Sequence, residues 1–288
     1  MTDRQRGRAA AGTHVGATSP TRPGKIVRSG NSPRAEATLR GGGRRGYYRA
    51  VLGPALLLGA FFVGRTARAG PPFLTDDPEP VELGHWEFYL ASQWTAEDHS
   101  ATGSTPHVEV NYGALPELQL HVIVPATLAW QSGQPVQYGL GDIELGAKYR
   151  FVEEGERRPQ IGTFPLVLVP TGSKERGLGA GTTQVFLPIW IQKSFGPWMT
   201  YGGAGLHIAS GDNDIVAGWL LQRKLPGMIA LAAEAFFTFP LNENPVELQV
   251  NLGLVVDFSD RHHLLASAGP AFGGEARGQG YLAYQLTI

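Results

Sequence analysis

Four charged residues alternate with less polar ones along a single segment of the chain. They are Asp142, Glu144, Lys148 and Arg150. In an extended strand, side chains two residues apart share a face, so two acids and two bases would lie on one surface. Such a surface could form a charged constriction that orients a solute, or the charges could pair across neighbouring strands and stabilise them. The residue pattern leaves both roles open.

Polar residues at every second position mark further segments of the chain. We interpret them as ordinary lining of the same aqueous interior, and together with the four charges they form the predicted pore lining. These residues are Glu109, Asn111, Gln119, His121, Glu247, Gln249 and Asn251.

Residues for other chemistries do not occur in productive patterns. The chain has no cysteine, which excludes disulfides and a cysteine nucleophile. The adjacent His262 and His263 would point to opposite faces of a strand, so we expect no metal site there. We also expect the protein to have no cofactor. His207 and Ser210 are components of a hydrolase, but nothing marks the third member of a triad. We expect no catalytic residue, and a membrane-embedded hydrolase stays an alternative.

The segments that carry these residues have the period of β-strands. Along 247–258, for example, Val250 and Leu252 belong to an apolar face, whereas Gln249 and Asn251 belong to the opposite one. From residue 84 onward, the pattern and its turn residues predict about twelve strands. Their expected ranges are 84–95, 106–112, 116–129, 139–151, 159–169, 183–195, 197–208, 215–225, 227–239, 246–258, 261–270 and 280–288.

Two features favour a closed antiparallel transmembrane β-barrel over a soluble β-sandwich. Trp86 and Trp94 share one face of a strand, eight residues apart, which is roughly 20 Å along the membrane normal and close to the spacing of two aromatic girdles. The odd connections are mostly long and the even ones mostly short, as are outer loops and periplasmic turns. In hydrocarbon, only a closed barrel pairs every backbone group of a sheet. The predicted girdle residues are Trp86, Trp94, Tyr149, Phe151, Phe258 and Tyr284.

The beginning of the chain has the composition of an export signal behind a basic extension. Residues 1–43 are rich in Arg, Gly, Ser and Pro without apolar periodicity, so we expect them to be disordered. In 44–69, arginines precede a short apolar run, and Ala67-Arg68-Ala69 follows it. This order predicts a signal peptide that is cleaved near Ala69 and exports the chain to the outer membrane of a Gram-negative cell.

The remainder is predicted in two parts, a periplasmic N-terminal segment at 70–83 and the barrel at 84–288. Within the first part, Thr75-Asp76-Asp77-Pro78 predicts a turn, with calcium binding as the weaker alternative. Residues 70–288 carry eleven Lys or Arg against twenty-three Asp or Glu. This acidic balance argues against a nucleic-acid partner. The expected partners are outer-membrane lipid, a small-molecule solute and the barrel-assembly machinery.

The stretch Gly139-Leu-Gly-Asp-Ile-Glu-Leu-Gly-Ala-Lys-Tyr-Arg-Phe151 resembles the outer-membrane family known as the meta-pathway of phenol degradation proteins. Supporting motifs are Leu74-Thr-Asp-Asp-Pro-Glu-Pro80, Gly84-His-Trp-Glu-Phe88 and Val169-Pro-Thr-Gly172. The resemblance covers roughly residues 72–288. It implies an outer-membrane β-barrel and an uptake channel for aromatic or other hydrophobic compounds, and it transfers no substrate-binding residue.

These observations lead to three hypotheses about function. The first is a porin-like channel or transporter that lets small molecules, aromatic or hydrophobic ones among them, cross by passive diffusion. The second is a structural barrel with a plugged lumen and no transport. The third is the membrane-embedded hydrolase. Conductance or solute flux separates the first two, and an esterase assay addresses the third.

Overall fold

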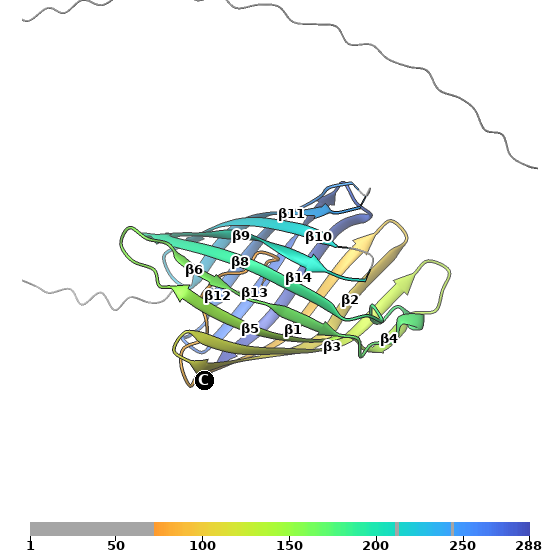
Figure 1. The fold of residues 1–288 in the computed structure, drawn as a ribbon, viewed down its shortest axis with the longest axis horizontal. Helices are drawn as coiled ribbons and strands as arrows, with labels where there is room; N and C mark the ends of the chain where they lie inside the picture. Colours follow the sequence, from red (N-terminus) through yellow and green to blue (C-terminus); the bar gives the residue numbers. More distant parts are fainter. Residues whose placement is uncertain (1–71, 211–212, 243–244) are drawn as a thin grey trace, which may run out of the picture. The chain divides into compact units, whose positions relative to one another are not determined.

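The structure, a computed structural model, describes residues 72–210, 213–242 and 245–288 (Figure 1). The predicted extension 1–43 and signal peptide 44–69 lie outside the described residues. In the described part, no helix is long and apolar enough to cross a membrane. A 3₁₀ turn, η1, covers Lys174–Arg176. The strands are β1 Trp86–Glu97, β2 Ser100–Leu115, β3 Leu118–Gln131, β4 Gln137–Leu140, β5 Ile143–Val152, β6 Gln160–Thr163, β7 Leu166–Val169, β8 Gln184–Phe195, β9 Trp198–Ile208, β10 Asp214–Lys224, β11 Ile229–Pro240, β12 Glu247–Asp257, β13 His262–Phe272 and β14 Ala276–Thr287.

The strands form one antiparallel sheet that closes on itself. β1 pairs with β14, so the first and last strands meet. Each remaining position in the sheet pairs with the positions that come before and after it in the chain. Two positions in the sheet are each shared by two strands. β4 and β5 both pair with β3, and β6 and β7 both lie between β5 and β8. The described segments therefore fill twelve positions, and the predicted twelve-stranded barrel is confirmed.

The two interrupted positions differ from the continuous strands expected at 139–151 and 159–169. The first break falls at Gly141 and Asp142, and the second at Phe164 and Pro165. Pro165 has no N–H to donate to a neighbouring strand, although its carbonyl still accepts a hydrogen bond from Ala147 N at 3.2 Å. β6 and β7 still pair with β5 and β8, and β4 and β5 with β3, so the interruptions leave the wall closed.

The first connection is much shorter than expected. The sequence predicts a loop over 96–105, but β1 ends at Glu97 and β2 already begins at Ser100. The start of β2 is small and polar, so its alternation is weak in the sequence. Gly103 lies so close to β1 that a Cβ there would stand 2.3 Å from Gln93 O, which explains a glycine at this point of the strand.

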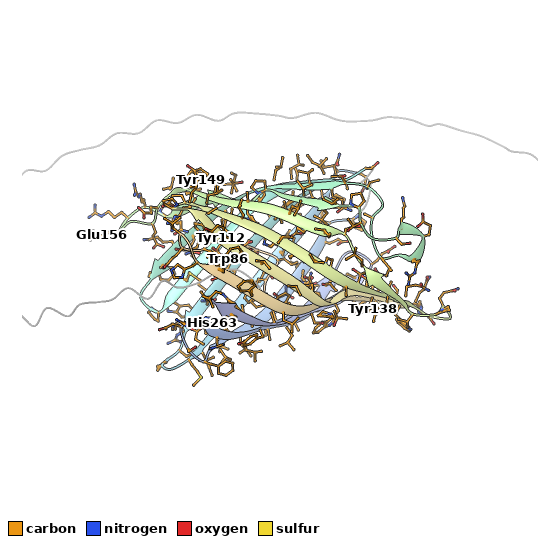
Figure 2. The ribbon with its side chains drawn as sticks, turned by 90° about the horizontal axis from the view of Figure 1, so that it is seen from below. Trp86, Tyr112, Tyr138, Tyr149, Glu156 and His263 are labelled. Atoms are coloured by element: carbon orange, nitrogen blue, oxygen red, sulfur yellow. The ribbon has the colours of Figure 1, made fainter. Side chains whose placement is uncertain are left out.

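Alternation along the strands separates an inner from an outer face, as predicted. On β12, Asn251 is completely buried whereas Leu252 is 68% exposed. All six predicted girdle residues are exposed, and Trp86 stacks on Tyr112 with ring centroids 4.3 Å apart. Tyr149 lies toward one end of the barrel, near Glu156, and Tyr138 toward the other (Figure 2). Their placement at two membrane interfaces stays a prediction.

The two ends of the barrel have different connections. One end, here called the turn end, carries the even connections, together with the start of β1 and the end of β14. The other, the loop end, carries the odd connections, including the longest, 170–183 with η1. The fourth connection, 153–159, is a longer link at the turn end.

Candidate functional site in the barrel lumen

Residues 72–81 lie inside the barrel, and residues 82–85, which lead from them into β1, are exposed at the turn end. Residues 72–85 are called the plug segment from here on. Its early part is held by Ser267, whose hydroxyl donates a hydrogen bond to Pro72 O. Its later part is held by Gln119, whose Oε1 accepts a hydrogen bond from Val81 N at 2.9 Å. The sequence predicts a periplasmic location for 70–83, but the structure places 72–81 against the inner face of the strands.

Inward-facing glycines make room for the plug segment, among them Gly162, Gly218 and Gly253. A Cβ at any of these glycines would approach a plug atom to between 2.1 and 2.9 Å, which real Cβ atoms essentially never do. Each therefore marks a point where the segment touches the wall. The pairs are Gly162 with Pro78, Gly218 with Thr75, and Gly253 with Phe73.

A buried lysine holds the acidic turn of the plug segment. Lys148 Nζ lies 2.9 Å from Asp76 Oδ1 and 3.5 Å from Asp77 Oδ1. Asp77 is completely buried, and burial raises its pKa from 3.8 to about 8, with Asp76 adding to the rise and Lys148 opposing it. One ammonium and two carboxylates are together neutral when one carboxyl keeps its proton, which is the favoured state in a site shielded from water.

A second basic residue holds the segment closer to the turn end. Arg150 Nη1 donates a hydrogen bond to Glu79 Oε1 at 3.1 Å, and its other nitrogens contact Glu117, which lies in the β2–β3 turn. Burial raises the pKa of Glu79, with Arg150 opposing the rise. Lys148 and Arg150 therefore bind acids of the plug segment, a role that the sequence pattern does not reveal.

An acid on β11 connects the plug segment to the polar lining. Glu234 Oε1 accepts a hydrogen bond from Thr75 N at 2.5 Å, and its Oε2 accepts one from Asn251 Nδ2 at 2.7 Å. Asn251 Oδ1 in turn accepts from Gln249 Nε2 at 2.7 Å. The sequence predicts Gln249 and Asn251 but misses Glu234. The signal that could have found it is an acid on an otherwise small or aromatic face, between Ala232 and Phe236.

The predicted lining of β2 and β3 forms a network of its own. His121 Nδ1 contacts Asn111 Oδ1 at 2.6 Å, and its Nε2 contacts Glu144 Oε1 at 3.0 Å. Asn111 Nδ2 donates a hydrogen bond to Glu109 Oε1 at 2.8 Å. Four of the predicted residues therefore meet across β2, β3 and β5.

Two predicted lining residues lie near the loop end. Asp142 falls in the break between β4 and β5, where its carboxylate accepts hydrogen bonds from Gly172 N at 2.9 Å and Ala180 N at 2.7 Å. Asp142 thereby fixes the connection 170–183. The sequence predicts Asp142 within a regular strand, and the structure does not confirm this. Glu247 begins β12, and its carboxylate packs against Gly274 in the last connection.

The histidines singled out in the sequence have structural partners. His207 lies between Asp214 Oδ2 at 3.4 Å and Gln184 Oε1 at 3.0 Å, so its second nitrogen faces an amide oxygen and not Ser210. His263 is buried beside Asp257, whereas His262 is exposed beside Tyr284. Within residues 72–210, 213–242 and 245–288, no three potential metal ligands cluster.

No family model and no curated protein matches the chain. Solved structures share its fold. An outer membrane channel from Pseudomonas putida F1 has a TM-score of 0.58 at 17% identity, covering 74% of this chain and 98% of that one. The KdgM porin has a TM-score of 0.50 at 6% identity, with coverages of 69% and 98%. The translocator domain of the autotransporter NalP from Neisseria meningitidis has a TM-score of 0.50 at 13% identity, with coverages of 72% and 89%.

Identities this low establish the fold alone. The chain has the architecture of outer-membrane β-barrels, several of which are channels or porins by name. The resemblance of 139–151 to the phenol-degradation family stays a prediction.

Proposed function

We propose that this protein is an outer-membrane channel for passive diffusion of small molecules, and that the plug segment controls passage through it. The loop end faces the outside and the turn end the periplasm in this proposal. The observation that carries it is a closed barrel whose interior holds a peptide on polar and charged side chains. An interior of that kind can exchange a peptide for water and solute, whereas an apolar core packed with side chains cannot.

The nature of the solute follows from the family resemblance and from the lumen. The resemblance points to aromatic or other hydrophobic compounds. The described lumen is acidic around Glu109, Glu144 and Glu234, which disfavours small anions in a narrow passage. Small uncharged molecules therefore fit the proposal best.

Cell fractionation and liposome swelling test this proposal. The full-length protein should appear in the outer-membrane fraction. Liposomes that contain the purified protein should swell in isosmotic solutions of small uncharged solutes, with rates that fall as solute size increases. Protein-free liposomes are the control for leakage.

The alternative function that the plug segment favours is a structural barrel without transport, because a permanently seated segment blocks the lumen. It predicts no swelling even when the contacts that hold the segment are removed. A hydrolase is not supported, because His207 contacts Gln184 where a nucleophile should stand. We propose no enzymatic role.

The raised pKa of Asp77 makes the seating of the plug segment depend on pH. A carboxyl whose pKa rises from 3.8 in water to about 8 in the seated state favours seating fully below pH 4. This contribution falls steadily as the pH rises to about 8 and then stays constant. Glu79 shifts in the same direction. We therefore expect the open probability in single-channel recordings to increase between pH 5 and pH 8.

The matched variant is Asp77→Asn, which keeps the shape of the side chain and cannot ionise. Its open probability should change much less across the same pH range. If the open probability of Asp77→Asn depends on pH as strongly as that of the wild type, titratable groups other than Asp77 cause the pH dependence.

A further inference from the structure

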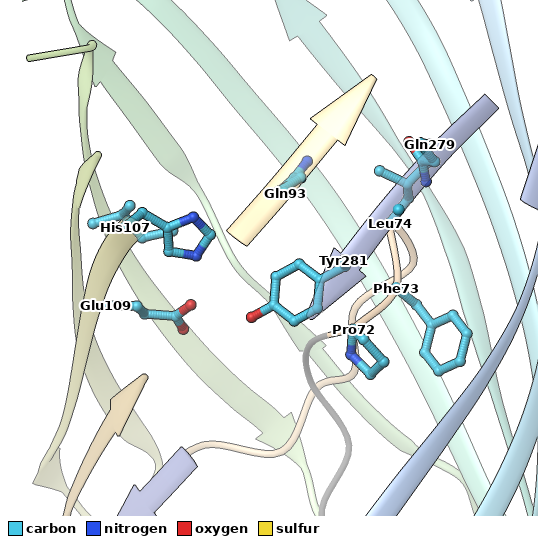
Figure 3. Close-up of a pocket in the computed structure, with 10 residues that line it drawn as sticks. Pro72, Phe73, Leu74, Gln93, His107, Glu109, Gln279 and Tyr281 are labelled. Carbon is cyan, nitrogen blue, oxygen red and sulfur yellow. The ribbon is translucent and has the colours of Figure 1, made fainter. Parts of the chain in front are cut away.

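A cavity of about 110 Å³ lies where the plug segment reaches farthest into the barrel (Figure 3). The segment contributes Phe73 and Leu74 to one side of it, and Ile123 of β3 adds apolar surface from the wall. Strands β1, β2 and β14 complete the lining. The cavity therefore borders both the plug segment and the barrel wall.

Polar groups gather on one side of this cavity. Figure 3 shows the Tyr281 hydroxyl pointing toward the side of the cavity that holds His107 and Glu109. Tyr281 and His107 are each more than nine-tenths buried. His107 Nδ1 contacts Ser104 Oγ at 2.7 Å, which leaves Nε2 to face the cavity. Among the described residues, no group hydrogen-bonds to Tyr281 Oη or to His107 Nε2.

Buried polar atoms without partners destabilise a folded protein unless another molecule satisfies them. Tyr281 Oη can donate one hydrogen bond and accept another, and His107 Nε2 can do one or the other according to its tautomer. Glu109 adds a carboxylate nearby. A hydroxyl group matches this set, because it accepts from the tyrosine and donates to the histidine or the carboxylate. An anion does not match, because it would face Glu109.

The size of the cavity limits the body that carries the hydroxyl. Benzene occupies an apolar cavity of roughly 150 Å³ in a well-studied case. In proportion, 110 Å³ holds roughly four or five carbon atoms. The apolar surface of Phe73, Leu74 and Ile123 suits such a body.

We propose that this cavity binds a compact, uncharged, cyclic hydroxy compound, with its ring against the plug segment and Ile123 and its hydroxyl on Tyr281 and His107. The proposal rests on the proposed channel function and names the chemical class of solute that pauses in the lumen. Tyr281 and His107 then determine specificity, because a hydrocarbon of the same size leaves their polar atoms without partners.

Calorimetric titration of the full-length protein, folded in detergent micelles, tests the proposal with cyclopentanol as the probe. Micelles without protein provide the blank, and cyclopentanecarboxylate provides the anionic comparison. We expect saturable binding of cyclopentanol at one site and none of the carboxylate. Tyr281→Phe, which removes only the hydroxyl, should weaken cyclopentanol binding roughly tenfold.

Two further variants keep the result interpretable. Tyr201→Phe removes another buried lumen hydroxyl that does not line the cavity, and it should bind cyclopentanol as the wild type does. Ile123→Phe fills the cavity from its apolar side and should abolish binding. Heat-modifiable migration on gels verifies that each variant is folded. Absent binding, or equal binding to the wild type and Tyr281→Phe, overturns the proposal. Liposome swelling by the same samples shows separately whether the channel function stands.

Discussion

Oxidation of the double variant Thr75→Cys/Gly218→Cys should close the channel. A Cβ at Gly218 would lie 3.1 Å from the Cβ of Thr75, and disulfides join Cβ atoms about 3.5–4.5 Å apart, so a shift of several tenths of an ångström is enough. The protein has no cysteine of its own to interfere. Liposomes with the oxidised protein should swell no faster than protein-free liposomes, and a reductant should restore the swelling.

Each single cysteine variant serves as the control and should be insensitive to oxidant. If the oxidised double variant conducts as well as the reduced one, solute passes beside a seated plug segment, and the segment does not control passage. Gel migration before and after reduction verifies that the disulfide forms.

Lys148→Met should have the opposite effect and release the plug segment. The substitution leaves Asp76 and Asp77 in the lumen without their cation. Removing one partner of a buried ion pair costs about 3–5 kcal/mol, which shifts the ratio of seated to released segment at least about a hundredfold. Single-channel recordings should show a much larger open probability, and liposome swelling should accelerate.

Two variants distinguish release of the segment from general loosening of the barrel. Lys193→Met breaks a more exposed lysine–carboxylate pair, with Glu154 in the β5–β6 connection, away from the plug segment, and should leave conductance unchanged. Adding Asp76→Asn and Asp77→Asn to Lys148→Met removes both carboxyl groups and should restore much of the seating. A barrel that stays closed in Lys148→Met supports the structural rival.

The strands could be predicted because one face of each is apolar and exposed, whereas the other is mostly polar and faces the lumen. That constraint appears directly as alternation, as in Gln249, Val250 and Asn251. The alternation is weak where the side chains are small, so the sequence does not indicate that β2 begins as early as Ser100. The sequence does not reveal the break at Pro165, because β7 directly after it is apolar on both faces and shows no alternation.

The candidate site was predictable only in part, for a different reason. Alternation placed Lys148 and Arg150 on the inner face, but their partners Asp76 and Glu79 lie 72 and 71 residues away. The plug segment has no periodicity, so nothing in its own sequence indicates that a lumen holds it. The inward glycines are the one local trace of the contact, since Gly218 and Gly253 interrupt the inner face where the segment touches it.

The position of the plug segment determines when its contacts can form during assembly. Thr75 is bound by Glu234, 159 residues later, and Pro72 by Ser267, 195 residues later. The segment leads directly into β1, which closes the wall with β14, the last strand to emerge. Its partners on β11 and β13 therefore become available only when the wall is nearly complete. The seam between β1 and β14 then closes beside a segment that is already bound to β11 and β13, and a chain truncated before β13 lacks the hydroxyl that binds Pro72.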